Sequence, residues 1–297
     1  LGALPASWPV WTGGPSEALI RLTGRLTGKA LRQPVHHFSS FEPFDVGPFT
    51  VTPLLTDHSA FDAHMLLIDA AGRRVLYSGD FRRTGRKAAL VDSLLARSPA
   101  AVDVLLMEGT TLGRTEGFPT EAELEERFVE LFRDTPGRVF VSWSAQNIDR
   151  TVTLYRASKR SDRPLVLDVY SLDVLEQLSA FRDTLPRLGW PGVRGVITTG
   201  VARMYRDPKR MNRPELVDRL ARTGHCISAS KLEDIPKGVV MLRPSLLRDY
   251  LAKGLRLTAN DAWVFSQWSG YLDQGGYPGV RSAFSDAGAR FAQIHTS

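Results

Sequence analysis

Two short segments carry residue types that bind divalent metal ions. His58 follows an apolar run that ends at Leu55, and Asp80 follows a second apolar run and a glycine, Gly79. Imidazole and carboxylate groups are the ligands that a catalytic zinc prefers, and one carboxylate can bridge two metal ions. Spacing alone nevertheless favours the simpler interpretation, in which a surface histidine and a turn aspartate never meet.

Three segments in chain order resemble motifs of one enzyme superfamily. Thr56–Ser59 and Ser78–Phe81 resemble the third and fourth metal motifs of the metallo-β-lactamase superfamily. Met107–Thr111 resembles the acidic motif that opens the β-CASP insertion in the nucleic-acid branch of that superfamily. Within this branch, the chain resembles ribonuclease J and the bacterial metallo-hydrolases similar to it. The resemblance covers nearly the whole chain, and three motifs in order are far more specific than any one of them.

The resemblance implies a role for each matching residue. His58 matches a terminal zinc ligand, Asp80 the carboxylate that bridges two zinc ions, and Glu108 the acidic residue that orients a metal-binding histidine. Two zinc ions would generate hydroxide at neutral pH and neutralise charge in phosphodiester hydrolysis. Loss of Asp80 is therefore expected to be more damaging than loss of Glu108.

A second group of polar residues, Ser142–Arg150, joins a predicted strand to the start of a predicted helix. Backbone N–H groups at a helix N-terminus bind anions, and serine, asparagine and arginine side chains can add donors. An ordinary capped helix would explain Ser144 alone. The stretch also resembles a ribonuclease J segment near the substrate phosphates, so we predict phosphate contacts for Ser144, Asn147 and Arg150.

Two later segments offer further candidates. Trp263–Tyr271 predicts either an aromatic platform for bases or a hydrophobic anchor between two units, with Ser266 as the polar substrate contact. Ile294–Ser297 resembles the start of the family's His-x-Ser-Gly-His segment, which makes His295 a catalytic candidate.

The resemblance is incomplete at both ends. The superfamily's leading signature, His-x-His-x-Asp-His, is absent, and the family's final zinc-binding histidine would lie beyond Ser297. We interpret the chain as a fragment of a parent protein with two zinc ions. A histidine and an aspartate are too few ligands for tight zinc binding, so we expect the 297-residue fragment to be inactive by itself.

Hydrophobic patterning predicts the elements that would position these residues. Short apolar strands precede His58, Asp80 and Glu108, whereas strands and helices alternate after Thr120, as in parallel βαβ units. The expected fold class is therefore α/β, an incomplete metallo-β-lactamase αββα sandwich with an inserted β-CASP-like α/β domain. The expected boundaries are residues 1–117 for the core, 118–287 for the insertion and 288–297 for a strand that returns to the core.

Composition agrees with a globular protein of mildly basic character. The net charge is +6 and the pI is about 9.6, a balance that favours polyanions such as nucleic acid, but on charge alone an arginine-rich solvated surface is the preferred interpretation. The single cysteine, Cys226, excludes an internal disulfide and a cysteine zinc cluster. No apolar run is long enough to span a membrane, and no signal peptide is visible, so we expect a cytoplasmic protein.

The predicted function is zinc-dependent hydrolysis of phosphodiester bonds, with RNA as the expected partner. Two alternatives stay open: a hydrolase of the same fold that acts on a small ester or lactone, and a metal-free binding or scaffold homologue. The sequence also leaves a homodimer open.

Overall fold

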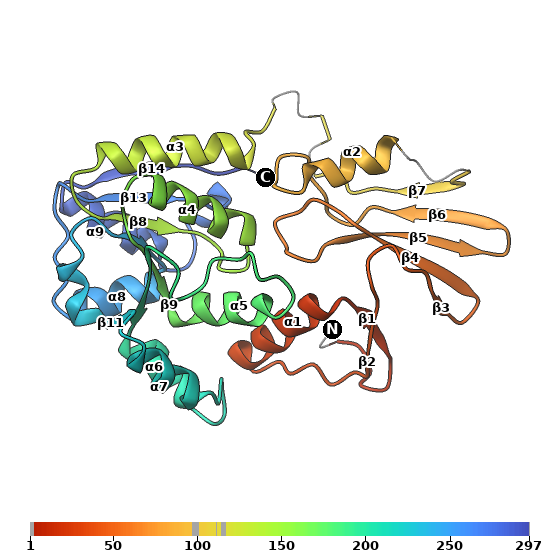
Figure 1. The fold of residues 1–297 in the computed structure, drawn as a ribbon, viewed down its shortest axis with the longest axis horizontal. Coiled ribbons are helices and arrows are strands. Elements are labelled where there is room, and N and C mark those ends of the chain that lie inside the picture. Colours follow the sequence, from red (N-terminus) through yellow and green to blue (C-terminus); the bar gives the residue numbers. More distant parts are fainter. Residues whose placement is uncertain (1–2, 97–100, 111, 114–116, 297) are drawn as a thin grey trace.

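The computed structural model describes residues 3–96, 101–110, 112–113 and 117–296. The chain has a mixed α/β fold with a five-stranded sheet, a seven-stranded sheet and a two-stranded pair (Figure 1). We refer to residues 3–113 as the first unit and to residues 117–296 as the second unit. The C-terminal end lies between the two large sheets in Figure 1.

The five-stranded sheet of the first unit has the order β3-β4-β5-β6-β7 and is antiparallel except for the β6–β7 pair. Alternating burial along β4 and β5 indicates one face toward a small core, to which Val91 of α2 contributes. The elements of this sheet are β3 (Phe44–Val46), β4 (Phe49–Leu55), β5 (His64–Ala70), β6 (Arg73–Tyr77), α2 (Ala88–Ala96) and β7 (Val104–Leu106).

The seven-stranded sheet of the second unit is entirely parallel, with the order β11-β10-β9-β12-β8-β13-β14. Its central strands are buried on both faces because helices cover them, as parallel sheets require. The strands are β8 (Val139–Ser142), β9 (Leu165–Asp168), β10 (Val193–Ile197), β11 (Cys226–Ser228), β12 (Val239–Met241), β13 (Ala262–Phe265) and β14 (Arg290–Gln293). The helices are α3 (Glu121–Asp134), α4 (Ile148–Arg160), α5 (Val169–Ser179), α6 (Thr199–Arg206), α7 (Pro214–Arg222), α8 (Pro244–Ala252) and α9 (Tyr277–Asp286), with two short 3₁₀ turns, η1 (Ala229–Asp234) and η2 (Ser269–Tyr271).

The strand β14 corrects one prediction. The sequence predicted that residues 288–297 return to the sheet of the first unit. Instead, β14 pairs in parallel with β13 and forms an edge of the seven-stranded sheet. The hydrophobic pattern of this segment indicates a strand but does not show with which strand it pairs. In the structure, Phe291 of β14 packs on Trp263 of β13, with ring centroids 4.8 Å apart.

The N-terminal segment bridges the two units. β1 (Val10–Thr12) pairs in parallel with β2 (Val35–His37), and α1 (Gly14–Thr27) lies between them in the sequence. This helix belongs to the first unit by sequence, yet it packs against α5 of the second unit (Figure 1). The contact between α1 and α5 therefore joins the two units at a place outside the cavity described below.

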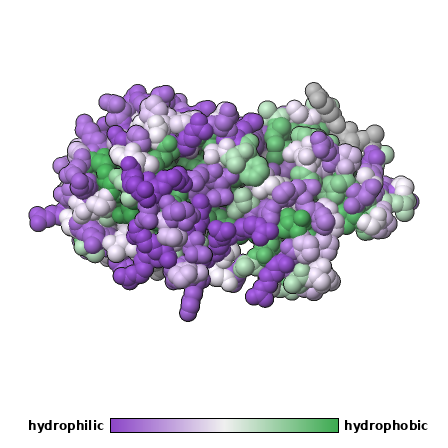
Figure 2. All heavy atoms as spheres, turned by 60° about the horizontal axis from the view of Figure 1, so that its bottom comes forward, coloured by the Kyte–Doolittle hydropathy of each residue, from purple (hydrophilic) through white to green (hydrophobic). Residues whose placement is uncertain are grey.

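The first unit leaves apolar residues exposed around β7. Tyr77 is 47% exposed and Met107 is 60% exposed, and all three residues of β7 are exposed as well. In Figure 2 hydrophobic atoms are spread over the right part of the molecule, whereas hydrophilic residues dominate the left part. These exposed apolar side chains follow one another along the chain, from β7 to Met107. Among the described helices, none has the length and apolar character that crossing a membrane requires.

Candidate active site

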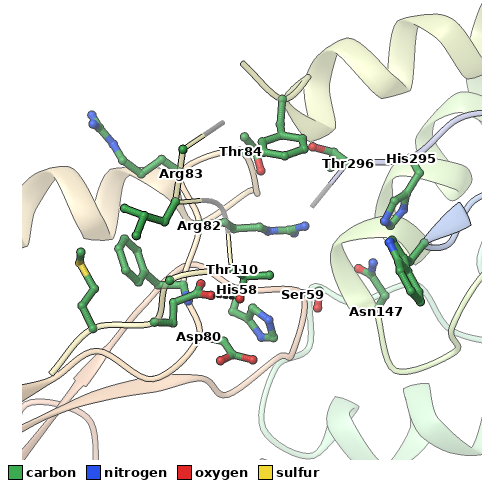
Figure 3. Close-up of a pocket in the computed structure, with 18 residues that line it drawn as sticks. His58, Ser59, Asp80, Arg82, Arg83, Thr84, Thr110, Asn147, His295 and Thr296 are labelled. Carbon is green, nitrogen blue, oxygen red and sulfur yellow. Dashed lines mark hydrogen bonds between the residues drawn. The ribbon is translucent and has the colours of Figure 1, made fainter. Parts of the chain in front are cut away.

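A cavity of about 700 Å³ contains residues from both units. His58, Asp80 and Glu108 of the first unit line it together with Asn147 and His295 of the second unit. In Figure 3, His58 and Asp80 lie together on one wall, and Asn147 and His295 lie on the facing wall. The two residues that spacing alone could not bring together therefore share one cavity.

The loop after β4 holds His58 through its buried neighbour, Asp57. The Asp57 carboxylate accepts the backbone N–H of Gly85 at 2.8 Å, and its backbone carbonyl accepts the N–H of Arg82, also at 2.8 Å. Lys87 Nζ donates to the carbonyl oxygens of Ala60 and Phe61 at 3.0 Å each. A side chain at Gly85 would collide with the Asp57 carboxylate, because its Cβ would lie 2.2 Å from Oδ1. Glycine is therefore required for this close approach.

Burial governs the protonation of the His58 imidazole. Removal from water lowers the pKa of His58, and the nearby carboxylates of Asp80 and Glu108 partly oppose that shift. Nδ1 accepts the N–H of Ala60 at 3.2 Å, and this contact likewise favours the neutral imidazole. A neutral imidazole is the form that binds a metal ion.

Asp80 lies at a bend that follows β6. Gly79 has φ +52°, which is the left-handed region where glycine is favoured, and the next side chain, that of Asp80, lines the cavity. Glu108 follows β7 on the neighbouring strand, and its N–H donates to Ser78 Oγ at 3.2 Å. The Glu108 carboxylate accepts the Thr110 hydroxyl at 2.6 Å, and this hydrogen bond is the main cause of its lowered pKa. Both carboxylates thus lie at adjacent strand ends beside His58. Thr111, the last residue of the predicted motif, lies outside the described residues.

The facing wall begins where β8 leads into α4. Asn147 caps α4, since its Oδ1 accepts the N–H of Arg150 at 3.1 Å, and its side chain also lines the cavity. Ser144 is exposed and lines a smaller adjoining cavity of about 360 Å³ together with Asn147 and His295. The helix N-terminus and these two side chains face space that a ligand can enter.

Arg150 does not fit the predicted phosphate contact. Its side chain is fully buried and forms an ion pair with Glu121, with Nη2 at 3.0 Å from Oε1. Its Nη1 donates to Ser266 Oγ and, at 3.4 Å, to the carbonyl oxygen of Ile294. The prediction failed because the sequence does not reveal that a helix-start arginine is enclosed by four elements. Arg150 instead holds together the starts of α3 and α4 and the ends of β13 and β14.

Ser266 lies between Arg150 and the last strand. Its Oγ donates to the carbonyl oxygen of Ile294 at 2.6 Å and accepts from Arg150, so its single proton is committed within the fold. The residue is 2% exposed, although it belongs to the lining of the smaller cavity. Through these two bonds Ser266 positions the strand end that leads to His295.

The aromatic segment after β13 has two different parts. Trp263 is completely buried and packs on Tyr277 and Phe291 within the second unit. Trp268, in contrast, is 56% exposed, lines both cavities and contacts Tyr271 edge-to-face with ring centroids 5.3 Å apart. The buried and the exposed aromatic side chains are therefore different residues, and the buried Trp263 packs within one unit rather than between two.

His295 and Thr296 follow β14 into the cavity. Within the described residues, neither His295 Nδ1 nor Thr296 Oγ1 has a hydrogen-bond partner, although both atoms are buried. Buried polar atoms are normally hydrogen-bonded, so an orphaned pair beside a cavity is a feature of ligand sites. Ser297, the last residue of the predicted motif, lies outside the described residues.

The cavity also contains an arginine that the sequence did not single out. Arg82 of the first unit donates to the Asp149 carboxylate at 2.6 Å and lies 3.8 Å from Glu121, both in the second unit. Because all three side chains are largely buried, this network fixes the two walls relative to each other. No local pattern marks these residues, since the network arises only when the units pack together.

The remaining histidines lie apart from the cavity lining. His36 stacks on Trp11, His37 pairs with Glu17, and Ser40 contacts His64 at 2.8 Å. The described part of the chain contains no group of three or more histidine, cysteine, aspartate or glutamate side chains placed to hold a metal ion. His58 and Asp80 are suitable ligand types, but two ligands do not make a closed zinc site.

The acid dependence of stability provides a test of the environment of His295. Burial, reinforced by the Arg150 guanidinium, lowers the pKa of His295 to about 4, from 6.5 in the unfolded chain. Between these values the unfolded state binds the proton more tightly, so the free energy of unfolding should decrease as pH falls from 6.5 toward 4. His295→Gln keeps a neutral side chain and should weaken this dependence. Urea unfolding of both proteins at several pH values measures the difference, and parallel curves would contradict the buried environment.

Comparisons with known proteins agree with the mixed α/β fold and indicate a distant relationship. No family model matches the chain. Ribonuclease J proteins from three strains of Helicobacter pylori, 26695, B128 and J99, are each 27% identical over 112 residues, which is 36% of this chain and 16% of the relative. A crystal structure of a protein of unknown function from Enterococcus faecalis V583 superimposes with a TM-score of 0.74 at 17% identity. It covers 100% of this chain, which spans 66% of that one. The chain is thus weakly ribonuclease J-like over about a third of its length.

Proposed function

We propose that this chain is part of a metal-dependent phosphodiester hydrolase that acts on RNA. One observation carries the proposal: His58, Asp80 and Glu108 share a cavity with Asn147 and His295 from the other unit. The first group offers metal-binding and acidic side chains, and the second offers donors at a helix start. The similarity to ribonuclease J supports RNA as the substrate.

The corresponding fold proposal treats the first unit as one half of a metallo-β-lactamase αββα sandwich. Such a sandwich has two sheets, and the first unit contributes the five-stranded one. The exposed apolar residues around β7 support this proposal, because they need a covering layer. The second unit would be the β-CASP-like insertion, with its boundary extended from residue 287 to include β14.

The small number of ligands in this chain limits how tightly it can bind zinc. His58 and Asp80 would be two of the ligands, and a bound ion would supply charge neutralisation at the phosphate and an activated water. Two ligands are too few for tight binding, so the 297 residues alone should bind zinc weakly and lack nuclease activity. Stoichiometric zinc together with phosphodiesterase activity in the 297-residue chain would overturn this expectation.

The chain's own residues would bind and orient the RNA strand. Ser144 and Asn147 would contact phosphates, and Trp268 would stack on a base, while Arg150 and Ser266 support the wall from behind. We expect Asn147→Ala to weaken binding of single-stranded RNA by about 3- to 30-fold, because it removes a phosphate contact and part of a helix cap. Fluorescence anisotropy with a labelled RNA measures the loss, and Asn260→Ala, at an exposed position outside the lining of both cavities, is the matched control.

The decisive assay compares substrates for the whole gene product that contains these 297 residues. We expect cleavage of single-stranded RNA in the presence of Zn²⁺ or Mn²⁺. Turnover of a small ester or lactone without RNA cleavage would favour the first alternative, a hydrolase of the same fold with another substrate. RNA binding without any hydrolysis would favour the second alternative, a binding homologue.

A further inference from the structure

A second cavity, of about 530 Å³, lies at the carboxyl edge of the seven-stranded sheet away from His58 and Asp80. It opens between the ends of β9 and β12, where Asp168 and Arg243 contribute to its lining. The two strands are parallel, but the connections that follow them run toward opposite edges of the sheet. Helix α5 connects β9 to β10 on one side, and α8 connects β12 to β13 on the other. In open parallel sheets, ligands bind in the crevice at such a reversal.

Three arginines give this cavity an anion-binding character. Arg210 and Arg248 are exposed, and neither forms an ion pair with another described residue. Arg243 is held in place, since it pairs with the buried carboxylate of Asp168 and lies 5.4 Å from the ring centre of Tyr170. One oriented guanidinium and two uncommitted ones suit a phosphate group, which accepts several charged hydrogen bonds.

The acidic residues of the cavity are already engaged in the fold. Asp168 caps α5 by accepting the N–H groups of Tyr170 and Ser171, and Asp249 accepts the N–H of Gly200 at the start of α6. The start of α8 has no side-chain cap, and its first residue, Pro244, has no N–H, so the N–H groups of Ser245 and Leu246 are the ones that can face a ligand beside Arg243.

Apolar side chains complete the cavity. Leu26, Val201, Met204 and Leu246 belong to its lining. The cavity volume lies within the range of about 300–1,000 Å³ that is usual for small-molecule sites. A ligand with an anionic end and a flat, largely apolar body matches both the charged and the apolar groups of this lining.

We propose that this cavity binds a nucleotide, with its phosphate on Arg210, Arg248 and the start of α8 and its base against Val201 and Met204. The inference does not depend on the proposed function. A physical connection to the first cavity exists nonetheless, because Tyr170 accepts a hydrogen bond from Gln146 Nε2 at 2.8 Å. Gln146 lines the smaller adjoining cavity, so the nucleotide is either free or part of an RNA strand that continues toward His58.

The test uses the 297-residue chain and isothermal titration with adenosine 5′-monophosphate, adenosine and a ten-nucleotide oligoadenylate. The double variant Arg210→Ala/Arg248→Ala should lower the affinity for the phosphate-bearing probes by about tenfold or more. Arg203→Ala changes an exposed arginine on α6 outside the cavity lining and should leave the affinity within about twofold of the wild type.

Each outcome either tests whether a nucleotide binds in this cavity or shows whether its phosphate belongs to a free nucleotide or to an RNA strand. Arginine-dependent binding of the monophosphate supports a free nucleotide. Binding of the oligonucleotide alone, weakened by the double variant and by Asn147→Ala, supports a strand. The proposal is overturned if adenosine binds as tightly as the monophosphate, or if the double variant changes neither phosphate-bearing probe. These two overturning results do not concern the His58 cavity, so either of them would leave the proposed function unaffected.

Discussion

Replacing Arg150 by alanine is expected to lower the free energy of unfolding by about 3–5 kcal/mol. The substitution leaves the Glu121 carboxylate buried and removes one of its two ion-pair partners, so its charge is poorly compensated. It also removes donors from Ser266 and from the carbonyl oxygen of Ile294. Urea unfolding followed by circular dichroism measures the change.

Two comparison variants distinguish the effect of an uncompensated buried charge on stability from the effect of losing an arginine side chain. Arg160→Ala breaks an exposed pair with Glu126 and should change stability little. The double variant Glu121→Leu/Arg150→Met replaces the buried pair by apolar side chains and should recover part of the loss. A small effect of Arg150→Ala would contradict the role of this residue as the link between four elements.

The second large effect concerns hydrolysis of RNA by the whole gene product. If Asp80 holds the metal ions, Asp80→Ala should reduce the rate by about a thousandfold or more, because several kcal/mol of charge stabilisation are lost. Glu108→Ala should cost only about 10- to 100-fold, since Glu108 acts through another residue. Initial rates with labelled RNA give both values.

A distant aspartate provides the matched control for this series. Asp45 lies on β3, outside the cavity lining, and Asp45→Ala should leave the rate unchanged. Equal losses for Asp80 and Glu108 would contradict the different roles assigned to them. An unaffected rate in Asp80→Ala would remove this residue from the site altogether.

Elements with complete local signals could be predicted from the sequence. The sequence runs Val139–Ser142 and Ile148–Arg160 predict a strand and a helix, and β8 and α4 have these bounds. The Thr120 hydroxyl and Glu123 form the capping box that starts α3. The apolar run Leu165–Tyr170 predicts another strand, but that strand stops at Asp168, because the Asp168 carboxylate caps α5 instead. Local patterns thus define an element well and its ends less well.

Features that depend on packing could not be predicted. The choice of sheet by β14 depends on contacts with β13 that are remote in sequence, and the burial of Arg150 depends on Glu121, Ser266 and Ile294 together. The shared cavity of His58 and Asp80 is different, since a motif resemblance anticipated it where spacing could not. The second cavity was missed because Arg210, Arg243 and Arg248 form no recognisable motif.

The most direct test of the central claim asks whether His58 and Asp80 face one position for a divalent ion. Mn²⁺ broadens the NMR signals of nuclei close to it, even when it binds weakly. Titrating Mn²⁺ into the ¹⁵N-labelled 297-residue chain should broaden the His58 imidazole and the amides around Asp80 first, and Asp80→Ala should abolish that effect. Broadening centred on other residues, or broadening at His58 that persists in Asp80→Ala, would contradict the account.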